Sequence, residues 1–152
     1  MKKPLDEALS QEIGKAIQSK SNDSFQNAYK AALMTKGSIY VQGFLVWAGQ
    51  PYRPIEHGWV ELENSIIDPT FQHLNKKVEE LYYFPAHRLT VKKLKAAVEE
   101  AQEDYPEDDP LPVYGGAPYD YYGDRMLGGK EYKAAYEEAM AKSKELNKPS
   151  LN

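Results

Sequence analysis

The segments that decide the fold are Ile39–Trp47 (IYVQGFLVW), Ile55–Leu62 (IEHGWVEL) and Asn64–Asp68 (NSIID). The first is rich in β-branched and aromatic residues and is polar only at Gln42, which predicts a central strand that is buried on both faces. The residues around Glu63 and Asn64 can supply the tight turn of a hairpin between the other two segments. We therefore expect a three-stranded antiparallel unit over residues 39–68.

Helices are expected before and after this unit. Apolar residues at helical spacing predict helices over Pro4–Lys20, Phe25–Met34, Val91–Gln102 and Lys130–Asn147, and the composition of Glu80–Phe84 predicts a further strand. Gly37 is placed to end the second helix in a left-handed conformation. The chain is thus predicted to be a single α+β domain over residues 1–152, with a core at 24–71 and a helical extension with a long loop at 72–152.

The composition is that of an ordinary globular protein and excludes several functional classes. With 41% hydrophobic and 28% charged residues, a chain of 152 residues can bury a core. Its net charge of −4 argues against a general nucleic-acid binder. No stretch approaches the roughly 18 apolar residues that span a membrane, so we expect a cytoplasmic protein that does not bind membranes. The sequence contains no cysteine, which excludes disulfides and thiolate zinc sites.

The sequence contains no motif for a metal or a cofactor. The three histidines, His57, His73 and His87, share no metal-ligand spacing. The glycine pairs at 115–116 and 128–129 lack the lysine and the strand-to-helix turn of a phosphate-binding loop. We expect neither a metal nor a cofactor.

The hairpin carries the candidate chemistry. Alternate residues of a strand share a face, so His57 and Trp59 point the same way. If Glu63 and Asn64 form a two-residue turn, Asp68 lies opposite Trp59 and diagonal to His57, within reach of its side chain. A carboxylate beside an imidazole selects its tautomer and stabilises its protonated form, as in the base and orienter of a nucleophilic triad.

Taken singly, these residues have ordinary explanations, because a strand histidine is usually a satisfied polar group and an aspartate before proline usually starts a turn. Together, the string H-x-W-x-E-L, a short turn and I-D-P-T resembles the transglutaminase-like branch of the papain-like thiol enzymes. The resemblance covers Ser24–Phe71 and implies helices packed on a small antiparallel sheet. It assigns the catalytic histidine to His57, the adjoining tryptophan to Trp59 and the aspartate to Asp68.

The same resemblance places Ser24 where the superfamily has its nucleophilic cysteine, since S-F-Q-N-A-Y stands where small bacterial or phage relatives would have C-F-x-N-A-Y. Ser24 also ends a run of residues that favour a helix N-cap, so its ordinary role would be capping. A helix N-terminus lowers the pKa of a thiol and can hold an oxyanion, which suits a nucleophile there. Gln18 lies six residues earlier, at the offset of the oxyanion-hole glutamine in papain-like proteases, although it falls on a predicted helix.

The resemblance implies a thiol-type acyl-transfer enzyme (a protease, amidase, deamidase or transglutaminase) that acts on a protein or peptide amide. Whether water or an amine accepts the acyl group is left open. The serine has two explanations, a deliberate Cys→Ser change that silences an enzyme or a natural loss of the nucleophile. The alternative function is an inactive binding module that holds a partner with its tyrosine-rich loop. The tyrosines of this loop are Tyr114, Tyr119, Tyr121 and Tyr122. Their rings can equally anchor the loop to the domain.

Overall fold

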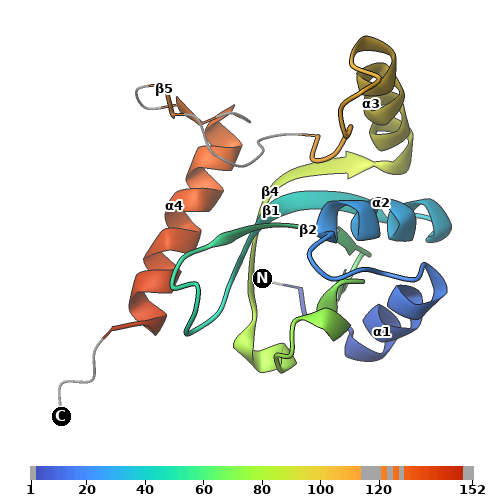
Figure 1. Ribbon diagram of the computed structural model, residues 1–152. Coiled ribbons are helices and arrows are strands. Elements are labelled where there is room, and N and C mark those ends of the chain that lie inside the picture. Colours follow the sequence, from blue (N-terminus) through green and yellow to red (C-terminus); the bar gives the residue numbers. More distant parts are fainter. Residues whose placement is uncertain (1–2, 114–120, 123–124, 127–128, 149–152) are drawn as a thin grey trace.

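The centre of the molecule is an antiparallel sheet with the strand order β3-β2-β1-β4. The computed structural model describes residues 3–113, 121–122, 125–126 and 129–148. The strands of this sheet are β1 (Ile39–Val46), β2 (Ile55–Glu61), β3 (Ile66–Ile67) and β4 (Tyr82–Thr90) (Figure 1). The expected three-stranded antiparallel unit is confirmed, and the chain has an α+β fold. The fourth strand comes from the part expected to be an extension, and it pairs with the free edge of β1.

The hairpin of β2 and β3 has the register expected for a two-residue turn. Val60 pairs with Ile67 and Glu61 with Ile66, and the Leu62 N–H donates to the Ser65 carbonyl at 2.9 Å. Continuing this register places residue 68 opposite residue 59, diagonal to residue 57. The third strand is shorter than the expected Asn64–Asp68 because pairing begins only at Ile66.

The helices are α1 (Glu7–Ala16), α2 (Ser24–Met34), α3 (Val91–Asp104) and α4 (Gly129–Leu146). Three of them lie close to the expected ranges, and Thr90 caps α3 by accepting from the Lys93 N–H. The expected Pro4–Lys20 helix is shorter at both ends. Asp6 caps its start through the Leu9 N–H, and Gln18 has a φ of 56°, which ends the helical conformation.

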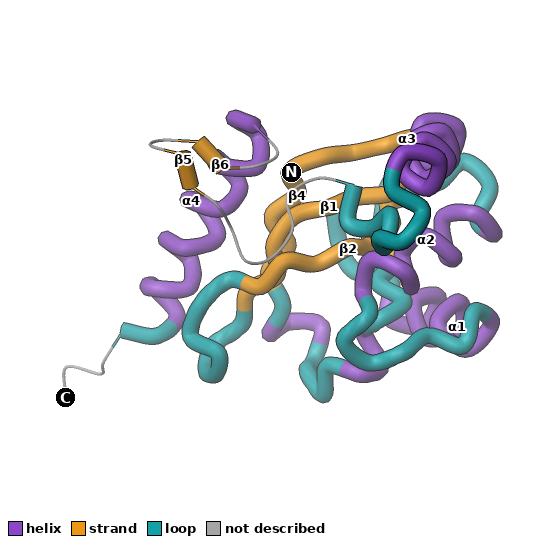
Figure 2. The backbone as a smooth tube through the Cα atoms, turned by 45° about the horizontal axis from the view of Figure 1, so that its top comes forward, coloured by secondary structure: helices purple, strands orange, loops and turns teal. Residues whose placement is uncertain are grey.

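These helices cover one face of the sheet. Tyr40 of β1 packs in a cluster with residues of α2 and α3, whereas Phe44 and Val46 of the same strand pack against α4. Figures 1 and 2 show α4 at one end of the sheet and α2 and α3 at the other. The Gly58 position of β2 lies directly under α2, where Phe25 and Ala28 approach it.

The opposite face of the sheet holds a second buried cluster. Its buried members are Val41, Leu45, Trp59, Ile66, Phe71, Leu81 and Tyr83. The segment that leads into α1 and the short 3-10 helices Phe71–His73 and Val78–Glu80 contribute to this layer. By strand alternation, His57 belongs to this face.

A short ribbon lies in the chain between α3 and α4. Strands β5 (Tyr121–Tyr122) and β6 (Arg125–Met126) form a separate two-stranded ribbon. Tyr114 and Tyr119, and the side chains of Tyr121 and Tyr122, lie outside the described residues, so the role expected for the tyrosine-rich loop stays a prediction. Among the described residues, no helix has both the length and the apolar character needed to cross a membrane.

Candidate functional site

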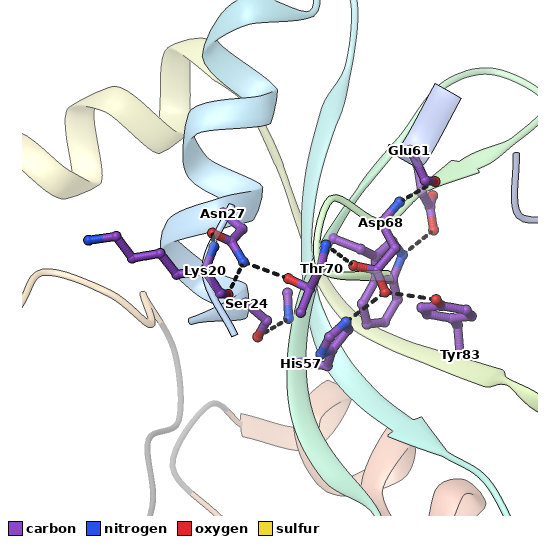
Figure 3. Close-up of polar contacts among 11 residues, drawn as sticks. Lys20, Ser24, Asn27, His57, Glu61, Asp68, Thr70 and Tyr83 are labelled. Atoms are coloured by element: carbon purple, nitrogen blue, oxygen red, sulfur yellow. Dashed lines mark hydrogen bonds and ion pairs between the residues drawn. The ribbon is translucent and has the colours of Figure 1, made fainter. Parts of the chain in front are cut away.

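His57 and Asp68 form a buried pair beside the hairpin. His57 Nε2 lies 2.7 Å from Asp68 Oδ2, and the two residues are 2% and 0% exposed (Figure 3). His57 comes from the middle of β2 and Asp68 follows β3, so the hairpin register brings them together. The diagonal pair expected from the spacing is therefore present.

Asp68 is held by further donors that point at both of its carboxylate oxygens. The Tyr83 hydroxyl donates to Oδ2 at 2.8 Å, and the Thr70 N–H donates to Oδ1 at 2.9 Å. The backbone N–H of Asp68 donates to Ser10 Oγ at 2.9 Å. Burial, reinforced by the Asp68 charge, raises the pKa of Tyr83 well above its usual value, so this hydroxyl stays a donor.

This arrangement assigns the roles of the two imidazole nitrogens. An ionised carboxylate only accepts hydrogen bonds, so the His57 Nε2–H donates and Asp68 Oδ2 accepts. Within the described residues the His57 ring makes no other hydrogen bond, and it borders a cavity. Nδ1 is then the nitrogen that can take up a proton from a group in that cavity.

Ser24 is the first residue of α2, and its hydroxyl does not cap the helix. The N-cap residue is Asp23, which makes no side-chain cap hydrogen bond. Instead, Ser24 Oγ accepts from the Gly58 N–H at 3.1 Å. That N–H is available because β3 pairs with β2 only at Val60 and Glu61. The capping role considered for Ser24 is therefore wrong, and its side chain links the start of α2 to the edge of β2.

The structure brings Ser24 close to the buried pair without a direct hydrogen bond to it. The helix α2 packs over the face of the sheet opposite to the His57 side chain, but its first residue lies at the edge of β2. Ser24 and His57 line the same cavity at that edge, with Gly58 next to His57 in the chain.

The cavity has a volume of about 350 Å³. Polar groups in its wall lie next to apolar side chains, which is the usual make-up of a small-molecule or peptide site. Its wall includes the first turn of α2, the start of β2, the segment after β3 and the segment after α3. The lining residues are Asn22, Asp23, Ser24, Phe25, Gln26, Ile55, Glu56, His57, Thr70, Leu74, Asp109 and Leu111.

A buried amide connects α2 to the aspartate segment. Asn27 Nδ2 donates to Thr70 Oγ1 at 2.8 Å and to the Lys20 carbonyl at 2.8 Å, and Asn27 Oδ1 accepts from the Lys20 N–H at 3.0 Å. Thr70 in turn donates its N–H to Asp68. These bonds hold the helix that carries Ser24 in a defined position relative to the pair of His57 and Asp68 (Figure 3).

The two residues expected to contribute to binding do not reach the cavity. Trp59 is fully buried, its ring packs edge-on against Tyr83 at 5.0 Å, and its Nε1 donates to Glu61 at 3.4 Å. It therefore supports the layer around His57. Gln18 lies in an exposed turn after α1 and is not among the residues that line the cavity. The helix on which Gln18 was expected ends at Ala16, and its role as an oxyanion-hole donor stays a prediction.

Sequence reasoning missed several residues that build the site. Tyr83 and Ser10 contact Asp68 from β4 and α1, which are distant in the chain, and no local motif marks them. Asn27 could have been noticed as a polar residue on the predicted buried side of its helix. Among the described residues, no three His, Cys, Asp or Glu side chains gather as a metal site would require.

Comparison with known proteins does not add a relative. The chain matches no protein-family model, no curated protein and no solved structure. The geometry of the cavity and its residues is therefore what points to a function.

Proposed function

We propose that this chain has the fold and catalytic residues of a thiol-type acyl-transfer enzyme of the papain-like, transglutaminase-like superfamily, with Ser24 at the position of the nucleophile. Its substrate is a protein or peptide amide, and its class is protease, amidase, deamidase or transglutaminase. The observation that carries the proposal is the buried His57–Asp68 pair beside a cavity that also holds the first residue of a helix.

Each residue has a distinct role in this reaction. A thiolate at position 24 would attack the amide carbonyl carbon, and the carbonyl oxygen would become an oxyanion. The backbone N–H of residue 24, at the start of α2, would stabilise that oxyanion. Protonated His57 would give its Nδ1 proton to the leaving amine as the C–N bond breaks, which leaves an acyl-enzyme. Water or a second amine would then attack the acyl carbon with His57 as the base.

The serine makes this chain a poor catalyst. A hydroxyl does not ionise near neutral pH, so it must lose its proton to His57 during the attack. Here the Ser24 oxygen accepts a hydrogen bond from the Gly58 N–H instead of donating to His57. The geometry suits a thiolate, because the Gly58 N–H and the helix start both favour a negative charge at this atom. We expect the chain to bind substrate and turn it over slowly or not at all.

The test is the reactivity of a thiol introduced at position 24. The S24C variant should react with iodoacetamide at about pH 6 at least ten-fold faster than a peptide thiol, because the helix start and protonated His57 stabilise the thiolate. Since the sequence contains no other cysteine, intact mass reports this position alone. His57→Ala in the same background should remove most of the enhancement, and Asp68→Ala should remove less.

The second candidate function is an inactive binding module, and the observation that favours it is the serine itself. The native codon at position 24 separates the two functions, since cysteine supports the enzyme and serine supports the module. An S24C variant that alkylates like a peptide thiol, with no dependence on His57, would contradict the enzyme and leave the module.

A further inference from the structure

A buried hydrogen bond joins Tyr83 to the candidate catalytic pair. The Tyr83 hydroxyl donates to Asp68 Oδ2 at 2.8 Å, and the same oxygen accepts from His57 Nε2 at 2.7 Å (Figure 3). The Thr70 N–H binds the other oxygen, Oδ1. Tyr83 is 8% exposed and Asp68 is fully buried, so these bonds lie in a region of low dielectric constant, where they are strong. Tyr83 and His57 therefore share one acceptor atom inside the protein.

A bulge in β4 places Tyr83 on the face of the sheet that holds His57. Tyr83 belongs to the buried cluster of that face, and strict alternation would put Leu89, six positions later, on the same side. Leu89 instead packs in the cluster of α2 and α3 on the opposite face, because the register shifts beside Gly43. Gly43 permits this close approach of the two strands, since a Cβ there would lie 2.1 Å from the Phe84 carbonyl oxygen.

The shared oxygen lets Tyr83 change how strongly Asp68 attracts a positive charge on His57. A hydrogen bond donated to a carboxylate disperses its negative charge and weakens its attraction for a neighbouring cation. The positive end of the Tyr83 O–H dipole also points toward the oxygen that His57 contacts. Burial and the Asp68 charge raise the pKa of Tyr83 well above its usual value, so the hydroxyl keeps its proton at neutral pH.

The proposed reaction makes two opposite demands on His57. Protonated His57 must stabilise the thiolate before the attack, and it must then give its Nδ1 proton to the leaving amine. An Asp68 oxygen that accepts from His57 alone would stabilise the imidazolium more and make it a weaker acid. The bond from Tyr83 therefore favours the second step while Asp68 still supports the first.

We infer that Tyr83 is a positioning residue that acts through Asp68: it fixes the oxygen to which the His57 ring is bonded and moderates the stabilisation of the imidazolium by that oxygen. Thr70 holds the other oxygen, so the carboxylate is held at both ends. This inference rests on the proposed function for the role of the imidazolium. The effect of Tyr83 on His57 itself does not require a reactive residue 24.

The test is the pH titration of His57 by nitrogen-15 NMR in the otherwise unmodified chain. The ring nitrogen shifts report the protonation and the tautomer of each histidine, and His57→Gln identifies the signals of this one among three. Tyr83→Phe should raise the pH midpoint of the His57 titration by about half a pH unit or more, because Asp68 Oδ2 loses a donor. A purely structural role of Tyr83 would not move this midpoint.

Tyr40→Phe is the matched control for the loss of a buried hydroxyl. Tyr40 is fully buried, and its hydroxyl donates to Gln42 Oε1 at 3.0 Å and not to Asp68. This variant should leave the His57 midpoint where it is in the unmodified chain. An equal rise in Tyr40→Phe and Tyr83→Phe would overturn the inference.

The other charged and titratable groups around the pair are the same in all these chains. They are Asp23, Glu56 and Asp109 in the cavity wall, Glu61 of β2, which is paired with Lys3 and Arg88, and His73, which is bonded to Ser19. A difference between the titrations therefore reports the change at the tyrosine.

A second substitution keeps the shape of the side chain and reverses the expected sign. Tyr83→fluorotyrosine, with the fluorine beside the hydroxyl, makes the O–H a stronger donor, so the His57 midpoint should fall by about a few tenths of a pH unit. A midpoint that stays constant in this variant, or that rises as in Tyr83→Phe, would contradict the inference even if Tyr83→Phe does not fold. These titrations are made with Ser24 in place, so an unreactive S24C variant would contradict the proposed function without changing their outcome.

Discussion

Gly58 is the point where α2 meets the sheet, and replacing it with alanine should disturb position 24 without removing a polar group. An added Cβ would lie 3.0 Å from Phe25 Cδ1, 3.3 Å from Phe25 Cα and 3.4 Å from Ala28 Cβ. Non-bonded carbons settle at about 3.5–4.0 Å. The Phe25 ring must therefore rotate, and the start of α2 must move outward by a few tenths of an ångström. Ser24 precedes Phe25 and moves with it.

The size of the effect follows from these contacts. Overpacking costs about 1–3 kcal/mol, and the lower chain entropy of alanine in the unfolded state returns about 0.4–1 kcal/mol. The free energy of unfolding should fall by about 1–2 kcal/mol, which lowers the melting temperature by roughly 2–8 °C. A misplacement of about 1 Å costs on the order of 100-fold in reactivity, so a few tenths of an ångström should cost about three- to five-fold.

The assay measures iodoacetamide alkylation and thermal unfolding in the S24C background. Gly37→Ala is the matched control, because Gly37 has a φ of +77° and nothing within 4 Å of an added Cβ. The left-handed backbone makes alanine unfavourable there by about 1–2 kcal/mol, far from the cavity. The control should lose stability and keep the S24C alkylation rate. If Gly58→Ala alkylates at the S24C rate, or if Gly37→Ala slows alkylation equally, α2 does not position the nucleophile through Gly58.

Two further predictions concern the carboxylate of Asp68 and its tyrosine neighbour. Asp68→Asn leaves one acceptor oxygen for the donors of His57, Tyr83 and Thr70. Alkylation in the S24C background should therefore slow, although by less than His57→Ala slows it, and the free energy of unfolding should fall by about 1–3 kcal/mol in urea titrations. Unchanged values would show that Asp68 does not orient His57. Burial raises the pKa of Tyr40 and Tyr83 far above the ordinary 10.0, so above that pH the unfolded chain releases protons that the folded chain keeps. The contribution of these tyrosines to the free energy of unfolding should therefore be fully present below about pH 10 and should be lost as the pH rises above it. The free energy of unfolding should fall less steeply with pH for Tyr83→Phe than for the unmodified chain. Equal slopes would contradict a raised pKa of Tyr83.

Local patterns in the sequence were sufficient for the helices, for the strands β1 to β3 and for one half of the site, whereas β4 extends to Thr90 and the expected strand ended at Phe84. The two-residue period of a strand and the length of the turn set the register of β2 and β3, and that register places His57 beside Asp68. The helix ranges followed from apolar spacing in the same way. The error in the expected bounds of α1 also has local causes. Asp6 caps the helix and Gln18 has a positive φ, so α1 is shorter at both ends than the expected Pro4–Lys20.

The other half of the site was decided by packing between segments that are distant in the chain. Tyr83 reaches Asp68 because β4 pairs with β1, and Asp109 reaches the cavity because Gln42 and Gln26 hold the segment after α3. Ser24 bonds to Gly58 instead of capping its helix because α2 crosses β2 at a residue without a side chain. Periodicity describes which face a residue takes within its own element. Which elements meet, and which side chains then share a cavity, depends on the burial of apolar surface across the whole fold.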